Sequence, residues 1–161
     1  MELDRAERIA DMIKAKLAPC CERIEVAGSI RRRRPFVHDI DIVLIPSNQG
    51  QLAVKLQELG KLKMGGQKLI RVEMPSGIML DVYIATPQTW ATLLLIRTGS
   101  ARHNISLCTL ARRQGRILKA DGSGLFDLTD CQGSESRVAG DTEESIFEAL
   151  GLKYKKPEER E

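Results

Sequence analysis

The sequence has no long uncharged apolar run, no cysteine pattern typical of a zinc site and no apolar signal segment. Its longest stretch without a charge lies between Asp81 and Arg97 and is interrupted by Thr, Pro and Gln, so it falls short of the roughly 20 residues of a membrane span. Met1 is followed by charged residues instead of an apolar core, which argues against secretion. We therefore expect an intracellular protein without a membrane partner.

Cysteine is scarce, and its spacing indicates neither a metal site nor a disulfide framework. Cys20 and Cys21 are neighbours, which do not easily bond to each other, and Cys108 and Cys131 stand alone. None of the four has the spacing of zinc ligands. We expect four reduced thiols with structural roles.

The charge of the chain is small in sum and uneven in distribution. The 161 residues carry 25 Lys and Arg against 22 Asp and Glu, a net charge of +3, with 42% apolar residues. A chain of this length buries about 70% of its unfolded surface and needs no metal or disulfide to form a core. Residues 97–120 contain no acid, whereas residues 121–161 contain eleven acids and five bases. With four arginines at 31–34, this predicts a positive face for phosphates, and an ordinary solvated surface is the alternative.

Hydrophobic periodicity and turn residues predict an α+β fold. Helices are expected at Leu3–Leu17, Gln51–Leu59, Pro87–Ile96, Ala101–Gln114 and Asp141–Leu150. Strands are expected at Arg23–Ala27, Val37–Ile45, Lys61–Met64, Lys68–Met74, Ile78–Ala85, Arg116–Lys119 and Leu125–Leu128. The pattern predicts a mixed sheet with flanking helices in residues 1–86 and a small α/β part in residues 87–161. The charged tail from Tyr154 onward is expected to be loosely ordered.

Three helix starts carry capping signals. Thr86 followed by Pro87 is typical of an N-cap with proline at the first helical position. Ser100 is expected to cap the next helix. Asp141 with Glu144 predicts a capping box for the last one.

Two aspartates, separated by one residue, occupy an expected strand. Because alternate side chains of a strand share a face, Asp39 and Asp41 point the same way while Ile40 and Ile42 point into the core. Close carboxylates must be solvated, share a proton or bind a cation, and oxygen donors alone favour Mg²⁺ or Mn²⁺. A D-x-D pair by itself is more often a solvated polar face.

Asp81 strengthens the metal interpretation. It lies in the apolar strand segment Met79–Ile84, where an acid needs a partner. Three carboxylates on neighbouring strands are typical of a two-metal site for in-line phosphoryl transfer. In this interpretation Asp39 and Asp41 hold both ions, while Asp81 ligates the catalytic ion and accepts the proton of the attacking hydroxyl.

A Gly-Ser turn precedes the arginine run. Gly28 permits close approach of the backbone to a phosphate, Ser29 donates a hydroxyl, and Arg32 pairs with negative charge. An ordinary strand-to-loop turn is the alternative.

A known family has the same motifs in the same order and spacing. They are Gly28–Arg32, Asp39-Ile40-Asp41, Asp81, Thr98-Gly99-Ser100, Asn104, the closing segment Val138–Leu152 and the tail Lys155–Arg160. From about Leu3 to Glu161 the chain resembles the nucleotidyltransferase core of the X-family DNA polymerases, the DNA polymerase β group. The resemblance implies a palm with catalytic carboxylates at 1–86 and a nucleotide-selection subdomain, thumb-like or fingers-like, at 87–161.

The resemblance also implies residue roles. Two Mg²⁺ ions, replaceable by Mn²⁺, would be held by Asp39, Asp41 and Asp81. The incoming nucleotide would contact Gly28, Ser29, Arg32, His38, Thr98, Gly99, Ser100 and Asn104, with a cis peptide expected in the Gly99-Ser100 turn. DNA would contact Arg97, Arg102, Arg112 and Arg113. For the arginines of the expected helix Ala101–Gln114, an ordinary surface helix is an equal alternative.

The chain departs from the family at several positions. Ile96 and Arg97 stand where the family usually has two aromatic residues against the sugar, so discrimination against ribonucleotides does not follow from the resemblance. His38 replaces a small residue, and a solvated histidine is the alternative to a nucleotide contact. Met79 and Cys108 stand where the family often has arginines near the primer terminus and template.

We therefore expect a template-directed DNA polymerase that adds dNMP from dNTP to a primer 3′-hydroxyl, filling short gaps during repair. It is expected to be a monomer that meets DNA, dNTP and a repair partner such as a ligase. One helix precedes Gly28, as in the smallest viral members, so we expect no lyase or exonuclease activity and steeply salt-dependent DNA binding. If the protein is bacterial, we expect it in the cytoplasm or associated with the nucleoid. If it is viral, we expect it in the host cell or in the virion. Untemplated nucleotide transfer and an inactive nucleic-acid-binding module are the alternatives.

Overall fold

The computed structural model describes residues 1–128 and 135–161, which form two compact units, Met1–Thr86 and Pro87–Glu161. Each unit has its own hydrophobic core. Among the described residues, no helix is long and apolar enough to cross a bilayer.

The first unit is built on a mixed five-stranded sheet, which confirms the α+β fold class. The strand order is β1-β2-β5-β4-β3, and only β2 and β5 run parallel. The strands are β1 (Cys21–Val26), β2 (Ile40–Pro46), β3 (Lys61–Gly65), β4 (Leu69–Glu73) and β5 (Met79–Ile84). The parallel pair lies in the middle of the sheet, where both partners are flanked by other strands.

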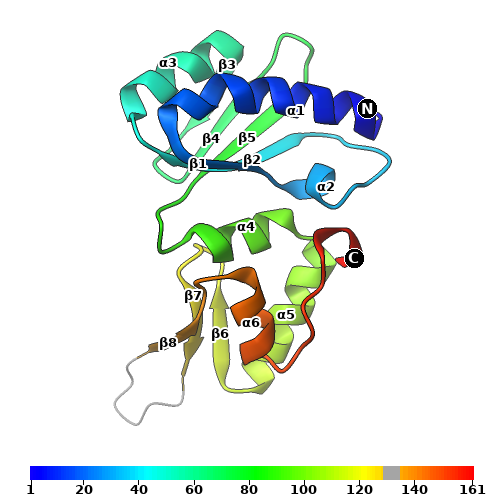
Figure 1. The fold of residues 1–161 in the computed structure, drawn as a ribbon, viewed down its shortest axis with the longest axis vertical. Coiled ribbons are helices and arrows are strands. Elements are labelled where there is room, and N and C mark those ends of the chain that lie inside the picture. Colours follow the sequence, from blue (N-terminus) through cyan, green and yellow to red (C-terminus); the bar gives the residue numbers. More distant parts are fainter. Residues whose placement is uncertain (129–134) are drawn as a thin grey trace. The chain divides into compact units, whose positions relative to one another are not determined.

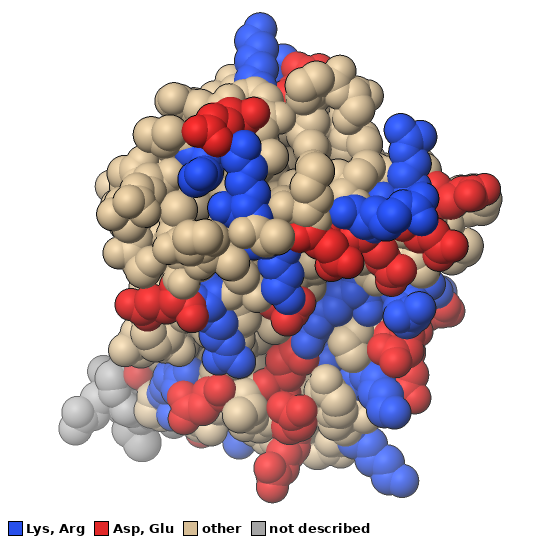
Figure 2. Space-filling view, turned by 45° about the horizontal axis from the view of Figure 1, so that its top comes forward, with Lys and Arg blue, Asp and Glu red and all other residues tan. Residues whose placement is uncertain are grey.

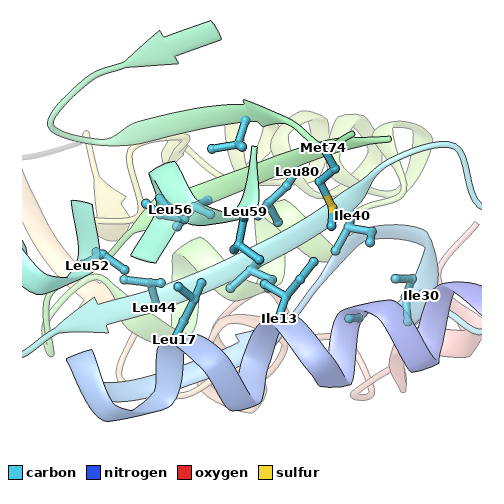
Figure 3. Close-up of a cluster of buried hydrophobic side chains, with 14 of the residues drawn as sticks. Ile13, Leu17, Ile30, Ile40, Leu44, Leu52, Leu56, Leu59, Met74 and Leu80 are labelled. Atoms are coloured by element: carbon cyan, nitrogen blue, oxygen red, sulfur yellow. The ribbon is translucent and has the colours of Figure 1, made fainter. Parts of the chain in front are cut away.

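Two helices, α1 (Leu3–Leu17) and α3 (Gln49–Leu59), cover one face of this sheet (Figure 1). Their apolar side chains meet those of β2 and β5 in one cluster, in which Ile13 and Leu17 approach Ile40 and Leu44 (Figure 3). Because side chains alternate along a strand, the residues between these core positions face the opposite side of the sheet. That opposite face carries Asp41.

The segment before β2 corrects one prediction. The strand expected from Val37 begins only at Ile40, because the backbone of 35–37 is tied to the chain's first residues. The Leu3 N–H donates to the Pro35 carbonyl at 3.1 Å, and Met1 and Val37 exchange two hydrogen bonds of 2.7 and 2.8 Å. Two short helical turns were also not predicted, α2 (Gly28–Arg31) and a 3₁₀ turn, η1 (Ala18–Cys20).

The second unit combines helices with a small antiparallel sheet. Its helices are α4 (Trp90–Thr98), α5 (Ala101–Arg113) and α6 (Glu143–Ala149), and its sheet has the order β6-β7-β8, with β6 (Arg116–Lys119), β7 (Gly124–Asp127) and β8 (Ser136–Ala139). Leu95, Leu107, Leu125 and Phe147 are among the core residues that join helices and sheet. The strand β8 was not predicted, because its exposed Ser136–Val138 segment carries no apolar alternation.

Two of the three predicted helix starts were wrong. Helix α4 begins at Trp90 with Thr89 as its N-cap residue, so the Thr86-Pro87 pair lies outside the helix. The capping box of α6 is formed by Thr142 and Ser145. The prediction for Ser100 is confirmed, since its hydroxyl accepts the His103 N–H at 3.2 Å at the start of α5.

The described cysteines are free thiols, as predicted. Cys20 is buried, and Cys21 and Cys108 are half-buried. Burial, and to a smaller extent the neighbouring Cys20, raises the pKa of the Cys21 thiol to about 11. Cys21 is therefore a poor nucleophile at neutral pH. Cys131 lies outside the described residues.

The C-terminal tail is anchored rather than loose. After the 3₁₀ turn η2 (Pro157–Glu159), Arg160 is 0% exposed and donates to both carboxylate oxygens of Glu143 at 3.2 Å. Its guanidinium lies 5.5 Å from the ring centre of Phe147 and 5.4 Å from that of Tyr154. The tail was predicted to be loosely ordered because its charged composition does not reveal that one arginine has a buried partner.

Removal of Arg160 should destabilise the protein strongly. Arg160→Ala leaves the Glu143 carboxylate, 7% exposed, without this counter-charge, a loss that costs about 3 kcal/mol or more. Urea unfolding of the whole chain measures the effect, with Glu158→Ala as an exposed control from the same tail. A loss as small as that of the control would show that the ion pair contributes nothing.

Candidate active site

Two aspartates face each other on the central strands of the first unit. In the parallel pair β2 and β5, Asp41 is the register partner of Asp81. Register partners on neighbouring strands share a face and lie about 4.8 Å apart along the hydrogen-bonding direction. Asp39 precedes β2 by one residue and is exposed. The structure thus brings the predicted pair of strands together at their acidic positions.

The carboxyl group of Asp41 is destabilised in its charged form. Burial, and to a smaller extent the charges of Asp39 and Asp81, raises its pKa to about 6. A hydrogen bond from Tyr83 and the positive charge of Arg32 act in the opposite direction but are weaker. A cation beside Asp41 would relieve this repulsion.

Asp81 is paired with an arginine that the sequence analysis did not single out. Arg71 on β4 is its register partner on the other side, and it donates from Nε and Nη2 to the two carboxylate oxygens at 2.6 Å each. Asp81 is 3% exposed, so the guanidinium supplies the partner that a buried acid needs. These hydrogen bonds, and the charge of Asp81, raise the pKa of the Arg71 side chain.

The carboxylate of Asp41 leaves no room for a side chain at position 28. It has φ of +59°, and a Cβ atom added to it would lie 2.0 Å from Oδ2 of Asp41. The Ala27 N–H donates to the Asp41 carbonyl at 2.8 Å, which ties the α2 turn to β2. Glycine is thus required both for the backbone conformation and for the close approach of the carboxylate.

The other predicted site residues of this unit lie in the α2 turn, at its end or in the loop that follows it. Ser29 lies in α2, and Arg32 caps its end; both are half-buried. Burial, and to a smaller extent Arg34, lowers the pKa of the Arg32 guanidinium, while Asp41 opposes this change. His38 is exposed in the loop before β2.

The donor chemistry around Asp41 suits a hard divalent cation. Carboxylate oxygens without thiolates or imidazoles are ligands of Mg²⁺ and Mn²⁺. Over residues 1–128 and 135–161, however, no three His, Cys, Asp or Glu side chains are gathered closely enough to hold a metal ion. Both oxygens of Asp81 instead accept from Arg71. The metal roles of Asp39, Asp41 and Asp81 stay predictions.

In the second unit, the predicted nucleotide residues cluster at the α4–α5 turn. The Gly99-Ser100 peptide is cis, as the resemblance implied, and Gly99 has φ of +70°. The side-chain amide of Asn104 donates to the Ile96 carbonyl at 2.8 Å, while its buried Oδ1 has no hydrogen-bond partner among the described residues. Thr98 is fully buried at the end of α4. Asn104 therefore keeps one free acceptor at this turn.

The predicted DNA-binding arginines of the second unit do not form one cluster. Arg97 is half-buried near the end of α4, and Arg102 is exposed in the first turn of α5. Arg112 and Arg113 are exposed at the other end of α5, about 15 Å away along the helix axis. In the view of Figure 2, Lys and Arg side chains are mixed with Asp and Glu side chains.

Arg71 and Tyr83 are the site residues that sequence reasoning missed. Tyr83 stands two residues after Asp81 in β5 and so shares its face. Lys68–Met74 and Ile78–Ala85 were predicted as consecutive strands, and pairing Glu73 with Met79 in the hairpin that they form places Arg71 opposite Asp81. The register of this hairpin was the available signal.

Comparison with known proteins finds matches to DNA polymerases. The sequence model for the DNA polymerase beta thumb matches residues 93–161. Two curated relatives are similar: DNA polymerase/3′-5′ exonuclease PolX of Bacillus subtilis (26% identity over 97% of this chain) and DNA polymerase lambda of Rattus norvegicus (31% over 83%). These matches show that the chain is similar to the X-family DNA polymerases.

The X-family fold extends over the whole chain. A crystal structure of Leishmania infantum polymerase beta, determined as a ternary P/T complex, matches 100% of this chain and 76% of its own with a TM-score of 0.83 at 21% identity. This chain spans only 28% of the length of each curated X-family relative. The structural match shows the fold, and the sequence matches support a polymerase or related nucleotidyltransferase at the family level.

Gly28→Ala should destabilise the protein through two separable effects. The alanine Cβ displaces the Asp41 carboxylate, and the positive φ adds backbone strain, for a sum of about 1–3 kcal/mol. Urea unfolding separates the two effects when Gly28→Ala is compared with the wild type and Gly28→Ala/Asp41→Ala is compared with Asp41→Ala. The cost of the alanine should shrink, without vanishing, when Asp41 is truncated. An equal cost in both backgrounds would contradict the contact.

Asp41→Asn should stabilise the metal-free chain at high pH. The pKa of Asp41 is about 6 in the folded state and lower, about 4, in the unfolded state. The protonated carboxyl thus contributes stability that is complete below pH 4 and is lost as the pH rises through 6. The variant should gain about 2–3 kcal/mol at pH 8 and nothing at pH 4. Urea unfolding in EDTA at several pH values measures this gain in stability, with Asp11→Asn at an exposed position as the control. A gain that does not change with pH would contradict the prediction.

Proposed function

We propose that the chain is a template-directed DNA polymerase that transfers dNMP from a dNTP to a primer 3′-hydroxyl. The observation that carries this proposal is the opposed pair Asp41 and Asp81 on neighbouring strands, beside the Gly28 turn, in a chain similar to X-family polymerases. Its substrates would be DNA with a primer terminus and a dNTP. Short gaps in DNA repair are the proposed setting, with a ligase as a later partner.

Asp39, Asp41 and Asp81 would hold two Mg²⁺ ions, or Mn²⁺ in their place. When bound, such ions neutralise the developing charge on the phosphoryl group and make the primer hydroxyl a better nucleophile. Asp81 would accept the hydroxyl proton at a carboxylate oxygen. The raised pKa of Asp41 supports cation binding, because a divalent cation compensates the repulsion between these acids.

The α2 turn would bind the triphosphate. Ser29 offers a hydroxyl, and Arg32 offers a guanidinium that is held near Asp41. His38 is exposed three positions before Asp41. Gly28 allows these groups to come close because it has no side chain. Charge-assisted hydrogen bonds from Arg32 would orient the phosphates for transfer.

The second unit would select the nucleotide. Gly99 and Ser100 would lie against the sugar, with buried Thr98 supporting their turn, and the free Oδ1 of Asn104 would accept from the base. Arg97, Arg102, Arg112 and Arg113 would contact phosphates of the DNA. Because such contacts release counterions, DNA binding should weaken steeply with salt.

Primer extension tests the proposal. The chain, with Mg²⁺ and one dNTP at a time, is given a one-nucleotide gap, an open primer-template and a single strand. We expect incorporation of the complementary dNTP, most rapidly in the gap. Asp81→Ala should reduce the rate by about three orders of magnitude or more, because a group that holds the reacting centre is lost.

Glu58→Ala is the matched control for Asp81→Ala. Glu58 is an acid of the same unit, but it lies on α3 and pairs with Lys16, so its removal should leave the rate unchanged. Addition to the single strand would indicate untemplated transfer, and DNA binding without incorporation would indicate an inactive module. The absence of exonuclease activity from these residues is a prediction that the same gels test as loss of primer. The absence of lyase activity is a prediction that requires a DNA substrate with a 5′-deoxyribose phosphate.

A further inference from the structure

The ion pair between Arg71 and Asp81 occupies the oxygens that a metal ion would need. Arg71 is held opposite Asp81 by the β4–β5 register and donates to both carboxylate oxygens at 2.6 Å. Asp41 is the register partner of Asp81 on the other side, in β2. Asp81 thus lies between a positive side chain on one strand and a negative one on the other.

This arrangement explains how the acids are tolerated without a cation. Asp81 is 3% exposed and next to a second carboxylate, so an unpaired charge at this position would be costly. The planar guanidinium matches the carboxylate with two parallel hydrogen bonds. Arg71 supplies the positive charge that a divalent ion would otherwise supply.

We infer that Arg71 is a positioning residue that holds Asp81 in the metal-free chain and competes with the divalent cation for its carboxylate oxygens. The inference rests on the proposed function, since it concerns the same site. The side chain of Arg71 is 41% exposed, so it has room to leave Asp81. Lysine could not replace it fully, because one ammonium group cannot reproduce the two-pronged contact.

The competition predicts two effects of opposite sign. Without Arg71, the buried Asp81 faces Asp41 with no guanidinium beside it, so the metal-free chain should be less stable. For the same reason the cation should bind more tightly, because no ion pair has to be broken. A purely structural arginine would produce the first effect without the second.

Mn²⁺ binding to the whole chain tests this inference. Electron paramagnetic resonance of free Mn²⁺ gives the dissociation constant, and thermal unfolding with and without Mn²⁺ gives the stability. For Arg71→Met we expect a lower melting temperature without metal and an affinity for Mn²⁺ that is about fivefold higher, the size expected for one partly exposed ion pair. Arg71→Lys should fall between Arg71→Met and the wild type.

Two control variants make the result specific. Lys61→Met removes one positive charge from the exposed edge strand β3, where Lys61 pairs in register with Glu73. It should leave Mn²⁺ affinity nearly unchanged, and tightening equal to that of Arg71→Met would overturn the inference. Asp81→Asn should weaken Mn²⁺ binding in the presence of Arg71.

The outcomes separate this inference from the proposed function. If the wild type binds no Mn²⁺ that depends on Asp81, both are wrong. If it does bind Mn²⁺ in this way, but Arg71→Met binds it equally or more weakly, only the competition is wrong. Circular dichroism checks that each variant is folded, and Arg71→Lys carries the test if Arg71→Met is not.

Discussion

The register of the two central parallel strands imposes the main constraint on this protein. It places Asp41 and Asp81 side by side, on the face of the sheet away from α1 and α3. A shift of β5 by one residue against β2 would move Asp81 into the apolar core and the core residue Leu80 out of it. Packing of the helices therefore fixes the acidic pair: the same alternation that builds the core builds the candidate active site.

The neighbours of the two acids compensate their repulsion unequally. Asp81 has a complete partner in Arg71, which takes both oxygens. Asp41 has a hydrogen bond from Tyr83 and the charge of Arg32, and these do not outweigh burial and the two nearby acids. Protein side chains thus neutralise one carboxylate and leave the other with unused capacity for a cation. Such incomplete compensation is typical of functional sites, where stability is given up for binding.

The sequence predicted the elements with strong periodicity better than their ends. Helix α1 has the predicted bounds because its apolar stripe is uninterrupted and is followed by Pro19. The start of β2 was wrong because hydrogen bonds to Met1 and Leu3, which no local pattern encodes, hold the preceding loop. The buried place of Arg160 depends on Glu143, seventeen residues earlier, and was equally invisible to local patterns.

The site residues, too, were predictable where a local pattern marks them and were missed where their role depends on distant contacts. Asp41 and Asp81 were predictable because an acid in an apolar strand is locally conspicuous, whereas Arg71 becomes significant only once β4 is paired with β5. Asn104 was found through the resemblance, and the structure adds that its buried side-chain oxygen accepts no hydrogen bond from the part of the chain that is described. Buried polar atoms are seldom left unsatisfied, so an unsatisfied one beside a turn is a place where a ligand can supply the missing donor. Each unit thus contains a polar group with capacity to spare, an under-compensated charge in the first and an unused acceptor in the second.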